Sequence, residues 1–502
     1  MTYRDKENAA SIVLITLPFS SDGIRPEMPN FQESLGIGYI TSAANSVGAE
    51  VEIIDLNLDS LEDLRLRLSM NPDIVGIQIV SGLNEKHART VLDLAKSCAS
   101  GAILAAGGPL VQALPRLVFS EFPQLDVLCV GDGEPFIIGL IRYLEQGDKS
   151  DVPNAVFRGF NHPTDKEISD FSLRPKRLHL EKQAAANWPV SVCTSRGCTS
   201  ACTFCAISCT LNRWRCRKAV DVVCEIEELI NAGAKRLWFI DENFIGTPVE
   251  GVKRAREIAE RMRSKNLFIP FQFSMRADFV ENSLLEDLMD VGCTKVNVGF
   301  ESIHDRCLVM YKKGYSSQVV RKAVTTLRNL GIGVSGGYIL FDPSSTQKEV
   351  LESLIFLKEN IDYFSLEKLF NRLQLYEATH LARYFTENGI VEKKSTWKRY
   401  YTFCDSTIQR FWNYIEYRDR LLKEFYTTIT NYRRKLVSKY RHNTEDIDPY
   451  KVYSELQRKI SIMLIDDAIE RLKDAAGEVT SSSSSVELLK KKLTQIIPED
   501  IQ

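Results

Sequence analysis

Three closely spaced cysteines constrain this chain more than any other feature. Cys198, Cys202 and Cys205 follow the pattern C-x3-C-x2-C, so one short loop carries all three thiols. Three thiolates on such a loop suit three irons of a [4Fe–4S] cluster, which usually takes four cysteines. The fourth iron would then be open to another ligand. The spacing alone also allows a zinc site with a distant fourth ligand, or thiols that are simply buried.

The distribution of cysteine favours a metal site over disulfide bonds. The 502 residues include 12 cysteines, and seven of them crowd into the stretch from Cys193 to Cys224. That number is too small for a disulfide scaffold in a chain of this length. The polar N-terminus and the short apolar run at 12–17 fit neither a signal peptide nor a membrane span. We therefore expect a cytoplasmic protein with reduced thiols.

The first 150 residues alternate predicted strands with predicted helices. Apolar, β-branched runs predict strands at 11–17, 50–55, 73–80, 102–109 and 126–131, and a helix at 35–44. Such alternation is typical of a parallel, doubly wound sheet, whose ligands bind beyond the carboxyl ends of the strands. The loops there are 20–30, Ser81-Gly-Leu83, Gly107-Gly108 and Gly131-Asp-Gly-Glu134. Their glycines let the backbone approach a large ligand, although the same sequences are typical of plain turns.

A second α/β segment follows a linker predicted at 151–189, whose first part, 151–165, reads as irregular. Between 190 and 372 the sequence predicts six strands separated by helices, which is typical of a partial TIM-like (β/α)6 barrel. The predicted strands are 190–193, 235–240, 271–275, 295–299, 334–340 and 363–370. The predicted helices are 219–232, 249–263, 284–291, 318–330 and 348–359.

An aromatic residue, Phe204, stands directly before the last cysteine of the motif. With it, the motif resembles the signature of the radical S-adenosylmethionine (SAM) superfamily. The resemblance implies a [4Fe–4S] cluster on Cys198, Cys202 and Cys205, whose open iron binds SAM. The sheet ahead of it resembles the cobalamin-binding domain that precedes the radical SAM domain in one large class of these enzymes.

Polar side chains at the predicted strand ends suit the groups of SAM. Carboxylate and amide oxygens suit its ammonium, an arginine suits its carboxylate, and an acid can accept from a ribose hydroxyl. The resemblance implies an acidic motif, a Ser-x-Arg and a Gly-x-Glu-Ser after successive strands, although each residue alone is also typical of a surface loop. The matching residues, with neighbouring Asn243, are Asp241, Glu242, Asn243, Ser274, Arg276, Glu301 and Ser302. We assign no general acid or base.

Two further family segments differ in how well they are kept. Residues 312–314, Lys-Lys-Gly, match a lysine segment of the family. Residues 341–346, Phe-Asp-Pro-Ser-Ser-Thr, lack both glycines and the glutamate of the family's Gly-x-Pro-Gly-Glu-Thr. No SAM contact is therefore assigned to the second segment.

The resemblance also implies a set of residues around cobalamin. Ser81, Leu83, Gly107 and Gly108 fall where such modules flank the nucleotide tail, and Gly131 and Glu134 lie in the next turn. Many modules carry a histidine that binds cobalt in the first loop, but loop 20–30 has none among the chain's six histidines. The ligation of cobalt therefore stays open, as does a domain that kept the fold and lost the cofactor.

The last segment, 373–502, is predicted to be a helical domain. One long amphipathic helix would place Phe411, Tyr414 and Phe425 on one face, with further helices at 450–473 and 486–496 and a flexible linker at 481–485. Such an aromatic stripe is usually core, but it also fits a wall over a substrate. This segment is least like the family, so we expect it to set substrate identity. Cys193, Cys209 and Cys216 are interpreted as packing thiols.

Three functional hypotheses follow. The first is a cobalamin-dependent radical SAM enzyme that methylates an unactivated carbon of a natural product, other small molecule or peptide, with a reductant such as flavodoxin or ferredoxin. The second keeps the radical chemistry but yields cyclisation, ring contraction or oxidation. The third is a non-catalytic electron-transfer protein. The net charge of −2 gives no indication of a nucleic-acid or membrane partner.

Overall fold

The computed structural model of the chain describes residues 9–18, 32–159, 173–210, 213–393, 396–440, 449–474 and 483–497. The predicted ligand loop at 20–30 lies outside these residues. Within them, no helix is long and apolar enough to cross a membrane.

The first segment forms a doubly wound sheet, as predicted, with strand order β2-β1-β3-β4-β5-β6. β1 to β5 are parallel, and β6 pairs antiparallel with β5. The prediction that 151–165 is irregular is wrong where β6 forms, because three apolar residues are too short a run to show a strand pattern. The bounds are β1 Ser11–Thr16, β2 Glu50–Asp55, β3 Ile74–Gln78, β4 Ile103–Gly107, β5 Val127–Cys129 and β6 Ala155–Phe157.

Helices cover both faces of this sheet and bury two separate apolar cores. α1 (Leu35–Asn45) and α6 (Gly133–Gln146) cover one face. The helices on the other face are α2 (Leu61–Leu68), α3 (Glu85–Cys98), α4 (Pro109–Ala113) and α5 (Pro115–Glu121). The short 3-10 helix η1 (Gly82–Asn84) leads into α3.

The second segment is a parallel sheet of order β13-β12-β11-β10-β7. Its strands are β7 Val190–Val192, β10 Leu237–Phe239, β11 Phe271–Arg276, β12 Cys293–Glu301 and β13 Gly333–Tyr338. Its helices are α7 Leu180–Ala185, α8 Ala219–Asn231, α9 Glu250–Ser264, α10 Asn282–Met289, α11 Asp305–Met310, α12 Ser317–Leu330 and α13 Gln347–Glu359.

The sixth strand predicted at 363–370 is wrong. This stretch forms two 3-10 turns, η5 (Ile361–Tyr363) and η6 (Leu366–Lys368). Its apolar residues come in adjacent pairs around a polar centre, so they do not alternate as a strand requires. A single bridge between Phe341 and Arg372 stands at the edge of the open barrel.

The last segment is mainly helical, but it begins with a small antiparallel sheet that was not predicted. The sheet, of order β14-β16-β15, comprises β14 Leu375–Tyr376, β15 Val391–Lys393 and β16 Lys398–Tyr401. The predicted long helix is two helices that meet at Leu422, and α18 already begins within the linker predicted at 481–485. The helices are α14 His380–Glu387, α15 Ser406–Leu421, α16 Lys423–Tyr440, α17 Pro449–Asp474 and α18 Ser483–Gln495.

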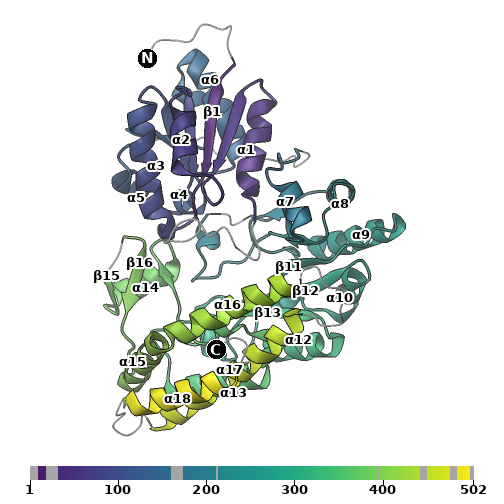
Figure 1. Ribbon diagram of the computed structural model, residues 1–502, viewed down its shortest axis with the longest axis vertical. Coiled ribbons are helices and arrows are strands. Elements are labelled where there is room, and N and C mark those ends of the chain that lie inside the picture. Colours follow the sequence, from purple (N-terminus) through teal and green to yellow (C-terminus); the bar gives the residue numbers. More distant parts are fainter. Residues whose placement is uncertain are drawn as a thin grey trace.

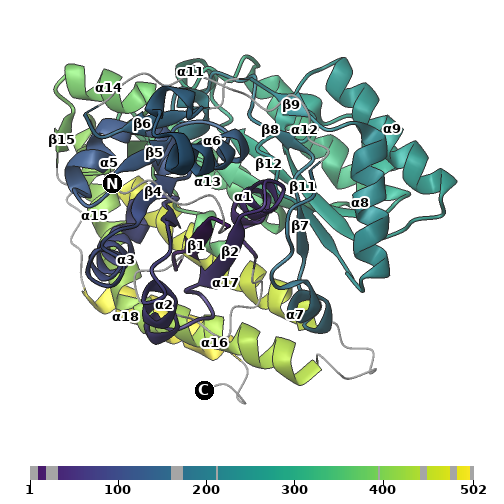
Figure 2. The ribbon, with the colours of Figure 1, turned by 90° about the horizontal axis from the view of Figure 1, so that it is seen from above.

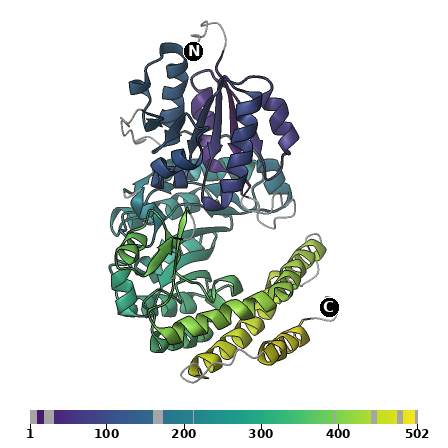
Figure 3. The same ribbon diagram turned by 90° about the vertical axis from the view of Figure 1, so that its left-hand side faces the viewer.

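The doubly wound sheet sits above the open barrel, and the C-terminal helices lie below it (Figure 1). Seen from above, α8 and α9 lie on the side of the molecule away from α14 and β15 (Figure 2). α16 packs against α17, and α17 against α18, in a layer along the barrel (Figure 3). The carboxyl ends of the barrel strands therefore face the first domain.

Trp397, just before β16, reaches from the last segment into the first domain. Its ring is buried in the core beside α3 and α5, and it stacks on Phe122 with 6.2 Å between ring centroids. Its indole Nε1 donates a hydrogen bond to Glu85 Oε2 at 2.7 Å. Gly82 leaves room for the ring, since a Cβ there would lie 2.5 Å from it. The last segment thus contributes directly to the core of the first domain.

Candidate functional site

The three motif cysteines lie on one tight loop after β7. The loop runs from β8 (Ser195–Arg196) to the 3-10 helix η3 (Ala206–Cys209), and β8 pairs with β9 (Arg215–Cys216). Cys205 N donates to Cys202 O at 3.1 Å. Ser208 Oγ lies 2.8 Å from Cys202 O and 2.7 Å from Cys205 O. These bonds fold the motif back on itself, with Cys202 buried and Cys198 and Cys205 partly exposed. We call residues 197–209 the cluster loop.

The end of α11 holds the cluster loop in place. Thr203 donates from its backbone nitrogen to Tyr311 O at 3.2 Å and from Oγ1 to Met310 O at 2.7 Å. The Phe204 ring meets the Tyr311 ring edge to face, with 5.4 Å between centroids. Phe204, which the motif predicts beside SAM, thus also has a structural contact with Tyr311.

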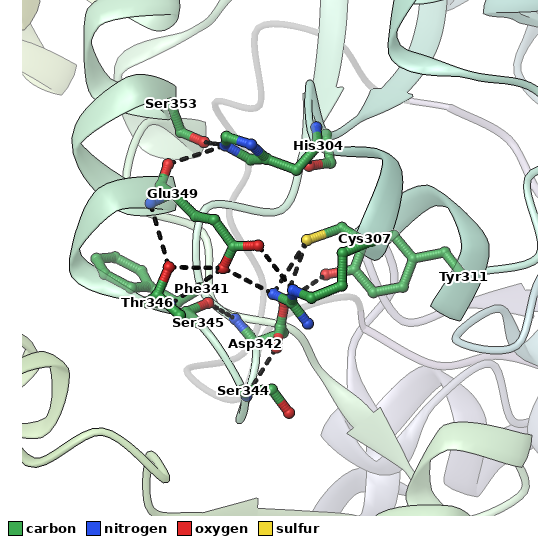
Figure 4. A network of polar contacts seen from close by, with 12 residues as sticks. His304, Cys307, Tyr311, Phe341, Asp342, Ser344, Ser345, Thr346, Glu349 and Ser353 are labelled. Atoms are coloured by element: carbon green, nitrogen blue, oxygen red, sulfur yellow. Dashed lines mark hydrogen bonds and ion pairs between the residues drawn. The ribbon is translucent and has the colours of Figure 1, made fainter.

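A buried polar network supports α11 in turn (Figure 4). Asp342 is 2% exposed, and its Oδ2 accepts from Arg306 at 3.2 Å, Cys307 Sγ at 3.6 Å and Tyr311 Oη at 3.3 Å. Its Oδ1 accepts from Ser344 N at 2.7 Å. The segment 341–346, where the family motif is lost, therefore anchors α11 and, through Tyr311, the cluster loop.

Two cations stand beside the cluster loop. Arg276 Nη1 lies 3.9 Å from Cys202 Sγ and donates to Ser200 Oγ at 2.8 Å, while Asp278 holds the other edge of its guanidinium at 2.9 Å. Lys313 is buried and pairs with Glu301 at 3.3 Å. Burial raises the pKa of the Cys202 thiol, and the positive charges of Lys313 and Arg276 act against this rise. Both cations therefore favour the thiolate, which is the form that binds iron.

The other predicted SAM residues differ in how free they are. Both carboxylate oxygens of Asp241 are used at the end of β7, by Thr194 N at 2.7 Å, Thr194 Oγ1 at 2.5 Å and Ser195 N at 2.9 Å. Ser302 is buried, and its Oγ accepts from His304 N at 3.1 Å. Ser274 contributes its carbonyl to Phe244 N at 3.0 Å. Asp241 and Ser302 thus have structural contacts, whatever else they bind.

Asn243 lies in the loop beside the cluster loop, and its side-chain amide has no partner. The residue is 1% exposed, and neither Oδ1 nor Nδ2 makes a hydrogen bond. A buried polar group left unpaired costs about 1–3 kcal/mol. An amide that presents both an acceptor and donors fits a ligand with an ammonium and a carboxylate, which are the groups that SAM carries.

A cavity of about 260 Å³ opens between the first domain and the barrel. It runs between the first sheet and helices α1 and α6, over small residues at Gly76, Ala105, Ala106 and Gly107. Gly108, at its edge, has a φ of 109°, and a Cβ there would lie 2.7 Å from Ile79 O, so only glycine fits. Such an apolar slot suits a flat heterocycle on the tail of a large cofactor such as cobalamin.

The structure divides the predicted cobalamin residues into two groups. Gly107, Gly108, Gly131 and Glu134 line the cavity. Ser81 and Leu83 do not: Ser81 Oγ accepts from Leu83 N at 3.3 Å at the start of η1, and Leu83 is 58% exposed. The Ser-x-Leu pattern therefore forms a helix cap, and no wall of this cavity.

Ion pairs join the two domains along the cavity. Arg196 pairs with Asp132 at 3.1 Å and with Glu134 at 2.5 Å, and Arg215 pairs with Asp132 at 2.5 Å. Glu242 also lines this cavity and accepts from Gly197 N at 3.1 Å. Burial raises the pKa of Glu242, and the nearby charge of Asp241 adds to this. The predicted SAM ligand Glu242 therefore faces the space between the domains.

Sequence reasoning missed several residues of this junction. Arg196 lies two residues before the cysteine motif. A charged residue so close to the motif could have indicated a role at this junction. Cys193, interpreted as a packing thiol, lines the cavity, and burial raises the pKa of its thiol to about 12. Arg215 and Trp397 gave no signal, because ion pairs and ring contacts between distant segments leave no local pattern. No three His, Cys, Asp or Glu side chains of the described residues are grouped for one metal ion.

Comparisons with known proteins agree with this architecture. The sequence matches the Radical SAM superfamily over residues 192–357 and the B12 binding domain over residues 24–140. It is 28% identical to an uncharacterized methyltransferase of Pyrococcus horikoshii, over 78% of this chain and 86% of that protein. It is 26% identical to 4'-phospho-dehydrooxetanocin synthase of Priestia megaterium, over 70% of this chain and 52% of that protein.

The fold is similar to that of a solved cobalamin-dependent SAM radical enzyme, OxsB, determined with aqua-cobalamin and SAM bound. The TM-score is 0.78 at 20% identity, covering 97% of this chain and 75% of that chain. With a B12-binding domain followed by a radical SAM domain, this chain is a B12-binding radical SAM enzyme. The radical SAM domain implies a [4Fe–4S] cluster and SAM as cofactors, and the B12 binding domain implies cobalamin. The expected α/β fold and the prediction of a radical SAM enzyme are confirmed, which disfavours the electron-transfer hypothesis and leaves methylation and the other radical reactions as proposals.

Proposed function

We propose that this enzyme methylates an unactivated carbon of a small-molecule or peptide substrate. The observation that carries the proposal is the shared junction: the cavity has walls from both domains, and α4 of the first domain packs against η3 of the cluster loop. When bound, SAM at a cluster reduced by one electron would supply the radical chemistry, and cobalamin would supply the methyl group. The proposed division of labour follows the predicted boundaries: 1–150 for cobalamin, a linker at 151–189, and 190–372 for the cluster and SAM.

The chain's own residues bind, orient and shield the cofactors. In the proposal Cys198, Cys202 and Cys205 hold the cluster, and Asn243 pairs with the amino-acid end of SAM. The apolar slot over β3 and β4 holds the tail of cobalamin and excludes water from it. Arg196 holds the two domains together beside the cavity, because it bridges them at Asp132 and Glu134.

Residues 373–502 are proposed to select the substrate. Their first part touches the cluster loop directly: Leu381 N donates to Thr203 O at 3.0 Å, and Cys209 Sγ lies 3.2 Å from Ala378 O. A substrate at the open iron would therefore contact α14 and the small sheet β14-β16-β15. A cytoplasmic flavodoxin or ferredoxin is the reductant we propose.

Radical chemistry without methyl transfer is the second candidate. The similarity to a protein named as an oxetanocin synthase supports it, since that name describes no methylation. Cyclisation, ring contraction and oxidation would all use the same cluster and SAM.

Isotope labelling separates the two candidates. The reconstituted enzyme is incubated anaerobically with reductant, cobalamin, candidate substrates and SAM that carries a labelled methyl group. Labelled methyl in the product, with formation of 5′-deoxyadenosine, supports methyl transfer. An unlabelled, altered product with 5′-deoxyadenosine supports the second candidate and overturns the first. The Cys202→Ala variant is the negative control.

A further inference from the structure

A second cavity lies at the opposite end of the barrel from the cluster loop. Its volume is about 300 Å³, and it opens at the amino ends of β7, β10, β11 and β12. Helix α16 borders it through Arg433. The lining residues are Pro189, Arg236, Leu237, Trp238, Pro270, Phe271, Gln272, Thr294, Lys295 and Arg433.

Three cations and no acid line this cavity. Arg236 donates from Nε to Asn187 O at 2.7 Å. Lys295 and Arg433 make no ion pair with any described residue, although Arg433 lies over the Tyr453 ring at 5.5 Å. The Nε of Arg433 is buried and has no hydrogen-bond partner among the described residues. Within that part of the chain, Lys295 and Arg433 therefore have no ion-pair partner.

The cations also act on one another. Burial lowers the pKa of Lys295, and the positive charges of Lys368 and Arg433 lower it further. No negative charge acts on Lys295 in the opposite direction. Partly buried like charges destabilise a fold unless a bound ion of opposite charge compensates them.

We propose that this cavity binds a small oxyanion of the phosphate class, either inorganic phosphate or the phosphate group of a small ester. Lys295 supplies a point charge, and the unpaired Nε–H of Arg433 donates to an anion oxygen. The side-chain amide of Gln272 adds a neutral donor at the wall, while the Thr294 hydroxyl donates to Phe271 O at 3.4 Å. The anion joins α16 to the bottom of the barrel, since Lys295 is on β12 and Arg433 on α16.

This site is independent of the proposed methyl transfer. It lies at the amino ends of the strands, whereas the cluster loop and the slot for cobalamin lie beyond their carboxyl ends. Loss of the anion site should therefore leave the iron content of the cluster unchanged, and failure of the methylation proposal would not affect it.

Thermal unfolding of the full-length, reconstituted protein tests the proposal. We expect inorganic phosphate to raise the melting temperature saturably relative to chloride at equal ionic strength. Lys295→Met and Arg433→Met should each remove this rise, whereas Lys322→Met, on an exposed face of α12, should keep it. Both cavity variants should fold, because each removes a repelling charge, and iron content serves as the check.

Two further arms complete the test. Methyl phosphate in place of phosphate distinguishes a phosphate ester from the free ion. An equal rise in melting temperature indicates a site for an ester, and no rise indicates a site for the free ion. Titration calorimetry should show one phosphate site in the wild-type protein and none in Lys295→Met. No rise in the wild-type protein, or an equal rise in the cavity variants, would overturn the proposal.

Discussion

Tyr311 donates its hydroxyl to the buried carboxylate of Asp342 at 3.3 Å and accepts at its own carbonyl from Thr203 of the cluster loop at 3.2 Å. One residue thus links a buried acid to the loop that carries the cysteines. Replacing Asp342 by alanine leaves Cys307 and Tyr311 without this acceptor, whereas Arg306 keeps its ion pair with Glu349. We expect a loss of about 1–3 kcal/mol in the free energy of unfolding, with less iron retained after reconstitution.

Urea unfolding and iron analysis check this expectation. Ser344→Ala is the matched control, because Ser344 offers only its backbone N–H to Asp342. We expect the control to change stability by no more than about 0.5 kcal/mol. Full iron content in Asp342→Ala would show that the network does not support the cluster loop.

The cysteines near the cluster loop should fall into two classes. Cys202→Ala should abolish the cluster and the cleavage of SAM, since it removes a proposed iron ligand. Cys209→Ala should retain both, because Cys209 is exposed and its thiol lies against Ala378 O. Iron and sulfide content after anaerobic reconstitution distinguishes them, and equal loss in both variants would contradict the assignment.

Asn243→Leu should separate stability from ligand binding. The variant replaces a buried amide that lacks partners by an apolar side chain of similar size, so we expect equal or higher stability without SAM. SAM affinity should fall by about tenfold or more, as expected for a lost hydrogen bond to a charged group. Thermal unfolding and equilibrium dialysis measure the two effects, and unchanged SAM affinity would remove Asn243 from the site.

The cobalamin slot can be tested with one bulky substitution. A Cβ at Gly107 would lie at an ordinary 3.5 Å from Cys129, so Gly107→Val should fold while its methyl groups enter the cavity. We expect these methyl groups to overpack the slot when cobalamin is bound, at a cost of about 1–3 kcal/mol in binding free energy. Cobalamin affinity should then fall by about tenfold. Leu83→Ala is the control, since Leu83 is exposed and outside the cavity. The absorbance of bound cobalamin after gel filtration reports both.

Trp397→Ala should destabilise the protein by about 3–5 kcal/mol, because it empties the space between α3 and α5. Tyr400→Ala, in β16 and 45% exposed, should change stability by no more than about 0.5 kcal/mol. Denaturant unfolding gives both values. Similar values for the two variants would show that the Trp397 contact contributes little.

Local patterns predicted the α/β parts of the fold well. β1 is a six-residue strand with a continuous apolar centre, and in β12 the apolar residues Val296, Val298 and Phe300 alternate with other residues. Neither signal depends on distant partners. The sequence failed where a short element takes its stability from packing, as at β6 and β14. It also failed at 363–370, where apolar content was taken for a strand although the residues do not alternate.

The candidate site was predicted by residue type better than by contact. The motif with Cys198 lies on one loop, and Gly107 and Gly108 lie at the carboxyl end of β4, because turns and motifs are local. Asp241 and Glu242 are adjacent, yet Asp241 is used by Thr194 and Ser195 after β7, and Glu242 faces the cavity between the domains. Which of the two carboxylates is used structurally depends on which backbone N–H groups lie nearby. Local sequence patterns do not give that information.

The insertion of Trp397 has a consequence for the order in which the chain can be completed. Its hydrogen-bond partner Glu85 lies 312 residues earlier in the chain. The core beside α3 and α5 is therefore complete only when the last segment is in place. A fragment that ends at residue 150 would expose the Phe122 face to water. The complete fold of the first domain therefore depends on residues from the last segment.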